Sequence, residues 1–180
     1  MTSKQSVPST QAVDMVQRLI DDVAAQPGLA LGQAFSLTRE RLAARTTPPD
    51  VGGALDDLGL TLTKSTDPLE APLYGNVFLA MAGALQGADR VDRENFGEAL
   101  TAGLDSVQTV GDTSPARRQL IDTLMAARNA YRDAAQSGQP FSACLDRMVA
   151  ACPAGRESAG PPLPALTLQT MARSIQAALS

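Results

Sequence analysis

The chain has 180 residues, a net charge of −4 and a pI near 4.8, and 44% of its residues are hydrophobic. This length fits one domain with a sizeable core, while the acidic balance and an aromatic content of 3% argue against a nucleic-acid-binding protein. With no histidine and two cysteines, the sequence offers no Cys/His metal cluster and no Ser-His-Asp or Cys-His catalytic constellation.

No stretch approaches the ~20 consecutive apolar residues of a membrane-spanning helix, and MTSKQSVPST at the N-terminus lacks the apolar run of a signal peptide. We therefore expect a cytoplasmic protein that binds neither membrane nor nucleic acid. Residues 1–180 are expected to form a single domain, of which residues 1–9 are a flexible tail. Cys144 and Cys152 would lie on one helix roughly 12 Å apart, beyond the ~7 Å limit for a disulfide, so we expect buried and unpaired thiols.

Apolar residues recur at helical spacing through the first half of the chain. The expected helices start at Ser9 or Thr10, at about Leu29, after Pro48-Pro49-Asp50 and at Pro72; three of them stop at Pro27-Gly28, Arg45 and Gln86. The helix from Pro72 is apolar almost all round, so we expect it to be central to the core.

The second half continues this pattern. Its expected helices run from an Asp92 cap to about Thr109, from Ser114-Pro115 to Ala135, from Pro140 to Ala151 and from Pro164 to Leu179. Strands have little support because runs of β-branched residues are missing. Eight amphipathic helices joined by short loops predict an all-α fold, an antiparallel helical bundle.

The segment GLTLTKSTDPLEAPLYGNVF at residues 59–78 resembles the ADP/ATP-binding L subunit (DhaL type) of the dihydroxyacetone (glycerone) kinases, in which the stretch reads approximately GxTLxSxxGGxSGPLYGxxF. Residues 107–124 and 155–158 look like two later segments of that family, in the same order. The resemblance implies an eight-helix barrel of the dihydroxyacetone kinase L-subunit type. In that family the loops at one end of the barrel hold the nucleotide, and the same end docks on the substrate-carrying K subunit.

The resemblance also indicates which positions correspond to the family's nucleotide site. In the family, a glycine- and serine-rich loop holds phosphates through backbone N–H groups. Here Asp67-Pro68-Leu69-Glu70-Ala71 stands in that place, with two carboxylates and a proline that lacks an N–H. For Arg117 and its neighbour Arg118, a phosphate grip competes with a solvated pair on an exposed helix start, which we favour. The aligned candidates for nucleotide contact are Gly28, Ser65, Thr66, Gly111, Pro115, Arg117, Gly155 and Arg156.

A second comparison concerns the metal. Three aspartates of the family hold two magnesium ions, and they align here with Leu19, Ala24 and Gln26. None of these side chains is an anionic ligand, so we expect no catalytic residue and no resident cofactor. A shifted alignment places Asp21 or Asp22 near one metal, and magnesium with ADP or ATP is expected only in that case.

Three functions remain open on the sequence. The first is a degenerate L-subunit homologue without magnesium–nucleotide binding, a non-catalytic partner-binding or regulatory protein whose partner is a K-type subunit or another protein. The second is an active but divergent kinase subunit that binds ADP or ATP through rearranged carboxylates. The third is a carrier of an apolar small molecule within the helical barrel. The carboxylates of the second hypothesis are Asp21, Asp22, Asp67 and Glu70.

Overall fold

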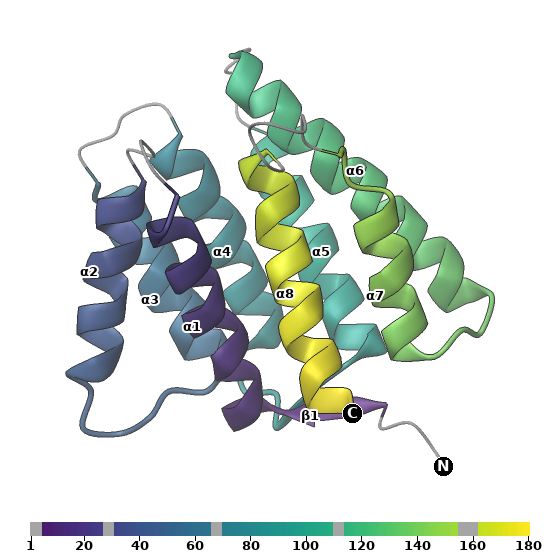
Figure 1. The fold of residues 1–180 in the computed structure, drawn as a ribbon, viewed down its shortest axis with the longest axis horizontal. Helices are drawn as coiled ribbons and strands as arrows, with labels where there is room; N and C mark the ends of the chain where they lie inside the picture. Colours follow the sequence, from purple (N-terminus) through teal and green to yellow (C-terminus); the bar gives the residue numbers. More distant parts are fainter. Residues whose placement is uncertain (1–4, 27–30, 66–69, 110–113, 155–161) are drawn as a thin grey trace.

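Eight helices run alternately up and down through the residues that the computed structural model describes, 5–26, 31–65, 70–109, 114–154 and 162–180 (Figure 1). Their bounds are α1 Ser9–Ala24, α2 Gly32–Ala43, α3 Val51–Thr63, α4 Ala71–Leu85, α5 Arg93–Gln108, α6 Pro115–Gln136, α7 Phe141–Ala150 and α8 Leu163–Leu179. The expected all-α, antiparallel fold is confirmed. Within the described residues, no helix is both long and apolar enough to cross a bilayer.

Side chains at several helix starts satisfy backbone N–H groups that have no partner inside the helix. The Asp50 carboxylate accepts from the Gly53 N–H of α3, and Asp92 forms a capping box with Asn95 at the start of α5. Helix α1 differs from the prediction, because Pro8 precedes its first residue and neither Ser9 nor Thr10 is the cap. The Ser9 hydroxyl instead accepts from the Val51 N–H, which joins the start of α1 to the start of α3.

A small antiparallel ribbon closes one end of the bundle. Strand β1, Ser6–Pro8, pairs with β2, Arg90–Asp92, and Val7 lies fully buried opposite Val91. The prediction that residues 1–9 form a flexible tail is therefore wrong for residues 6–9, because Ser9 is the buried first residue of α1. Each strand has three residues, too few to produce the alternating pattern by which strands are found in a sequence. Residues 1–4 of the expected tail lie outside the described residues.

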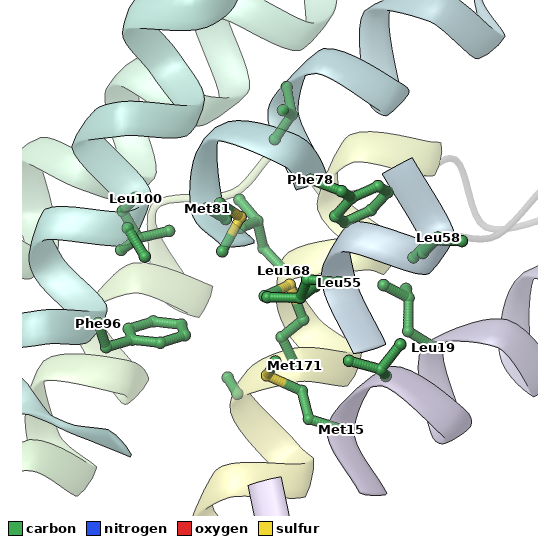
Figure 2. Close-up of a cluster of buried hydrophobic side chains, with 14 of the residues drawn as sticks. Met15, Leu19, Leu55, Leu58, Phe78, Met81, Phe96, Leu100, Leu168 and Met171 are labelled. Carbon is green, nitrogen blue, oxygen red and sulfur yellow. The ribbon is translucent and has the colours of Figure 1, made fainter. Parts of the chain in front are cut away.

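The core lies where α4 meets its neighbours, as the apolar sequence of that helix predicts. Figure 2 shows side chains from five helices pointing into the same interior. They are Met15 and Leu19 of α1, Leu55 and Leu58 of α3, Phe78 and Met81 of α4, Phe96 and Leu100 of α5, and Leu168 and Met171 of α8, each at most 2% exposed. Because these side chains come from both halves of the chain, the helices share one core.

The two cysteines are buried and unpaired, as expected. Only Cys144 lies on α7, because that helix ends at Ala150, so the expectation of a shared helix is wrong. Burial disfavours the charged thiolate and raises the pKa of Cys152 to about 11, and it raises the pKa of Cys144 as well. Both thiols are protonated near neutral pH and pack as small apolar groups.

Two facing glycines bring the backbones of α3 and α4 together. A Cβ atom on Gly59 would lie 2.9 Å from the Gly75 carbonyl oxygen and 2.9 Å from the Leu79 nitrogen. A Cβ atom on Gly75 would lie 3.0 Å from both the Gly59 carbonyl oxygen and the Thr63 nitrogen. Real side chains do not approach backbone so closely, so the crossing requires glycine on both helices. Both glycines belong to the 59–78 segment that resembles the kinase subunits.

We predict that Gly59→Ala and Gly75→Ala each lower the free energy of unfolding by roughly 1–3 kcal/mol, because the added methyl forces the two helices apart. The matched control is Gly83→Ala on α4, where a Cβ meets nothing within 4 Å and the glycine is exposed. That change should stabilise the protein by about 0.5–1 kcal/mol through helix propensity. Urea unfolding followed by circular dichroism measures the free energy of unfolding of the three variants. Equal effects at the three positions would contradict the requirement for glycine at the crossing.

Candidate functional site

The predicted site residues that the structure describes fall at one end of the bundle, opposite the two chain termini (Figure 1). We call it the loop end: α1, α3, α5 and α7 end there, and α2, α4, α6 and α8 begin there. Of the predicted residues, Ser65, Pro115, Arg117, Asp21, Asp22 and Glu70 are described by the structure. Gly28, Thr66, Asp67, Gly111, Gly155 and Arg156 lie outside the described residues.

The junction of α3 and α4 corresponds to the phosphate-binding stretch of the resembled family. The Ser65 N–H donates to the Leu62 carbonyl just past the end of α3. Pro72 occupies the first turn of α4, which therefore presents one N–H fewer. The Tyr74 N–H donates to the Glu70 carbonyl, and the buried Tyr74 hydroxyl has a raised pKa because of desolvation and the nearby Glu70 charge. The described part of this junction thus carries the Glu70 carboxylate and a neutral phenol, with the exposed Lys64 at the end of α3.

The two carboxylates proposed as replacement metal ligands point toward different helices. Asp21 forms an ion pair with Arg39 of α2 at 3.1 Å, and Asp22 accepts a hydrogen bond of 2.7 Å from the Thr170 hydroxyl of α8. Consecutive residues on a helix project about 100° apart, so the two groups diverge. Among the described residues, no group of three or more Asp, Glu, Cys or His side chains is arranged to hold a metal ion.

Arg117 lies at the junction of α5 and α6, and its side chain is turned inward. The guanidinium donates from Nε and Nη2 to the Val107 carbonyl, at 2.9 and 2.6 Å, and from Nη2 to the Gln108 carbonyl at 3.1 Å. These are the last carbonyls of α5, which have no partner inside their own helix and lie at the negative end of its dipole. Arg117 therefore holds the end of α5 against the start of α6.

This arrangement corrects the expectation of a solvated arginine pair. Arg117 is 9% exposed, and only its neighbour Arg118 faces solvent. Ser114 caps the same helix by accepting from the Arg117 N–H, while Pro115 is its exposed first residue. Ser114-Pro115 in the sequence indicated the start of α6 correctly. No pattern in the sequence indicated that Arg117 bonds to the last carbonyls of α5.

The structure has a hollow beside the loop end and a larger hollow that lies away from the predicted site residues. One, of about 420 Å³, lies beside the loop end between α1 and α2 and is lined by Gln26, Gly32 and Glu40 among others. The other, of about 630 Å³, lies along the outer side of α5 and α6. None of the predicted site residues lines the larger hollow, so the sequence reasoning missed it.

Comparisons with known proteins agree with this architecture. The family model described as the DAK2 domain matches residues 10–175 of the chain. The chain belongs to the DAK2 domain family. This match covers all eight helices apart from the first residue of α1 and the last turn of α8.

Two curated relatives resemble this DAK2 domain at low identity. The "PEP-dependent dihydroxyacetone kinase, ADP-binding subunit DhaL" of Escherichia coli strain K12 is 25% identical over 122 residues, 68% of this chain and 58% of the relative. "PEP-dependent dihydroxyacetone kinase 1, ADP-binding subunit DhaL" of Listeria innocua serovar 6a is 24% identical over 100 residues, 56% of this chain and 50% of the relative. The aligned part thus spans between half and three fifths of each relative. The relationship to the DhaL subunits predicted from the 59–78 segment is confirmed.

For the DAK2 domain we predict that Arg117→Met lowers the free energy of unfolding by about 2–3 kcal/mol, because it leaves two carbonyls of α5 without their charged donor. Arg118→Met, one residue away and exposed, should change it by less than about 0.5 kcal/mol. Urea unfolding of the two variants measures the difference. If Arg117→Met leaves stability unchanged, Arg117 does not hold α5 and α6 together.

Proposed function

We propose that this DAK2 domain is a non-catalytic homologue of the ADP-binding DhaL subunits, which binds a protein partner through its loop end and does not bind a magnesium–nucleotide complex. The observation that carries the proposal is the arrangement of charged groups at the loop end. Among the described side chains that would replace the family's phosphate and metal ligands, Asp21, Asp22 and Arg117 are engaged with other helices. The helical frame that presents this end is retained.

The metal part of the proposal rests on Asp21 and Asp22. Two magnesium ions beside a nucleotide need several carboxylate oxygens converging on one point. Here one carboxylate faces α2 and the next faces α8, each with a partner of its own. Moving Asp22 toward a cation requires breaking its bond to Thr170, and the two carboxylates still diverge. The described residues therefore do not fit a pair of magnesium ions.

The phosphate part rests on Arg117 and on the chain between α3 and α4. Turning the Arg117 guanidinium toward a phosphate would leave the Val107 and Gln108 carbonyls of α5 without their donor. Asp67 and Glu70 add negative charge where the resembled family carries neutral glycine and serine. Carboxylates repel a phosphate at close range. The charge in this segment thus opposes an anionic ligand.

Partner binding is supported by the names of the relatives, which describe subunits of a PEP-dependent kinase. A subunit associates with other chains of the same enzyme, and in the resembled family the loop end docks on the K subunit. Docking depends on the shape and charge of a surface, which the helical frame provides without catalytic ligands. A K-type dihydroxyacetone kinase subunit is therefore the partner that we propose.

The test mixes the purified protein with the K-type subunit from the same genome and measures association by sedimentation velocity. We expect a complex with a dissociation constant of about 1–10 μM and no phosphoryl transfer to dihydroxyacetone when this chain replaces a DhaL subunit. The double variant Lys64→Glu/Arg118→Glu, exposed at the loop end, should weaken the complex at least about tenfold. Asp89→Lys, exposed at the opposite end, is the matched control and should not weaken it.

Two outcomes would contradict the proposal. Phosphoryl transfer that requires both magnesium and nucleotide would show an active, divergent kinase subunit. The absence of a complex at the highest soluble concentrations would remove the proposed partner.

A further inference from the structure

The hollow of about 630 Å³ between α5 and α6 forms an open groove, which we call the α5–α6 groove. Its floor is made of small residues and one ring: Gly97 and Ala102 of α5, and Ala135 and Tyr131 of α6. A Cβ atom on Gly97 would lie 3.1 Å from Cε1 of Tyr131, so glycine at this position lets the ring pack closely against α5. The Tyr131 hydroxyl donates to the Arg93 carbonyl, which fixes the ring in place. The groove is thus part of the packed fold.

Opposite charges occupy the two walls of the groove, apart from Arg93 at the start of α5, whose guanidinium donates to the Gln139 carbonyl. Glu94, Glu98 and Asp105 on α5 are spaced by four and seven residues, so they lie along one face of that helix. Arg128 and Arg132 on α6 are spaced by four residues and lie along the other wall. Within the described residues, no ion pair joins the acidic wall to the basic wall. The charges of the two walls are therefore not paired with each other.

The two arginines of the basic wall differ in their partners: Arg132 forms an ion pair with Asp133 at 3.8 Å, whereas Arg128 has a donor without an acceptor in the described part of the chain. The Nε atom of Arg128 is buried and has no hydrogen-bond partner among the described residues. A buried donor without an acceptor costs roughly 1–3 kcal/mol, so most native structures supply one. A carboxylate from an occupant of the groove would bond with charge assistance to the Nη groups of this guanidinium, because the buried Nε is not itself accessible from the groove.

The length of the groove indicates the kind of occupant. Glu94 and Asp105 are separated by eleven residues of helix, a distance of about 16 Å, and this corresponds to about three turns of a second helix laid alongside. A helix in such a groove places small apolar residues on the floor and one charged flank on each wall. A nucleic acid is disfavoured by the three carboxylates, and a second copy would have to set one concave groove against another.

We propose that the α5–α6 groove binds an amphipathic α-helix of a partner protein. The flank of that helix over Glu94, Glu98 and Asp105 is basic, and the flank over Arg128 and Arg132 is acidic, with one carboxylate bonded to the Arg128 guanidinium. This surface runs along the side of the bundle and is separate from the loop end used in the proposed function.

The probe is a fluorescein-labelled synthetic helix of about 16 residues, with alanine and leucine on its inner face, lysine on one flank and glutamate on the other. Fluorescence anisotropy with the full-length protein should give a dissociation constant of about 10–100 μM. The control peptide has the same composition with lysine and glutamate mixed on both flanks. It should bind at least about tenfold more weakly, because each wall then meets like charges.

Reciprocal variants test the assignment of the walls. The variant Arg128→Glu/Arg132→Glu should bind the matched probe at least about tenfold more weakly than the wild type does. It should bind a probe with lysine on both flanks more tightly. The variant Glu94→Lys/Glu98→Lys should bind the matched probe more weakly and a probe with glutamate on both flanks more tightly. Because the two variants change opposite walls, the test remains valid if one of them folds poorly. Lys64→Glu/Arg118→Glu at the loop end should leave probe binding unchanged, so this proposal and the proposed function fail independently.

Three results would overturn the inference. The first is equal binding of the matched and mixed probes, and the second is no binding of the matched probe at millimolar concentration. The third is self-association of the protein in sedimentation velocity that Arg128→Glu/Arg132→Glu abolishes, which would make a second copy the occupant.

Discussion

The close crossing of α3 and α4 at Gly59 and Gly75 is the constraint on which the arrangement of the loop end depends. Backbone atoms occupy the space that side chains would fill, so these helices cannot separate or slide without losing contact. The crossing fixes the end of α3 and the start of α4, and buries α4 at the centre of the core (Figure 2). Gly59 and Gly75 belong to the helical parts of the 59–78 segment, which resemble the kinase subunits, whereas the loop between these parts does not. The two glycines are needed for the fold independently of any ligand.

Charged side chains at the loop end contribute to structure in this protein. Arg117 closes the α5–α6 junction by bonding to the last carbonyls of α5, and Asp22 joins α1 to α8 through Thr170. The Asp21–Arg39 pair is exposed and contributes at most about 1 kcal/mol, so it orients α1 and α2 only weakly. Charged groups at the loop end of this DAK2 domain thus hold helices together.

Much of the fold was readable in the sequence because its signals are local. The apolar periodicity and the Asp50, Asp92 and Ser114 caps depend on residues within a few positions of one another, and they located the helices. The β1–β2 pairing, the carbonyls bound by Arg117 and the opposed walls of the α5–α6 groove join residues ten to more than eighty positions apart. No pattern in one segment reports such contacts. The resemblance predicted the family correctly and placed candidate ligands at one end, several of them outside the described residues.

The central claim is that the helical frame of a nucleotide-binding subunit is retained while its magnesium–nucleotide site is not. Isothermal titration of the folded protein with ADP and with ATP, each with and without excess magnesium, tests it most directly. The account predicts no heat of binding up to millimolar nucleotide in either condition. Magnesium-dependent binding in the micromolar range would contradict it, and would mean that other carboxylates and N–H groups form the site.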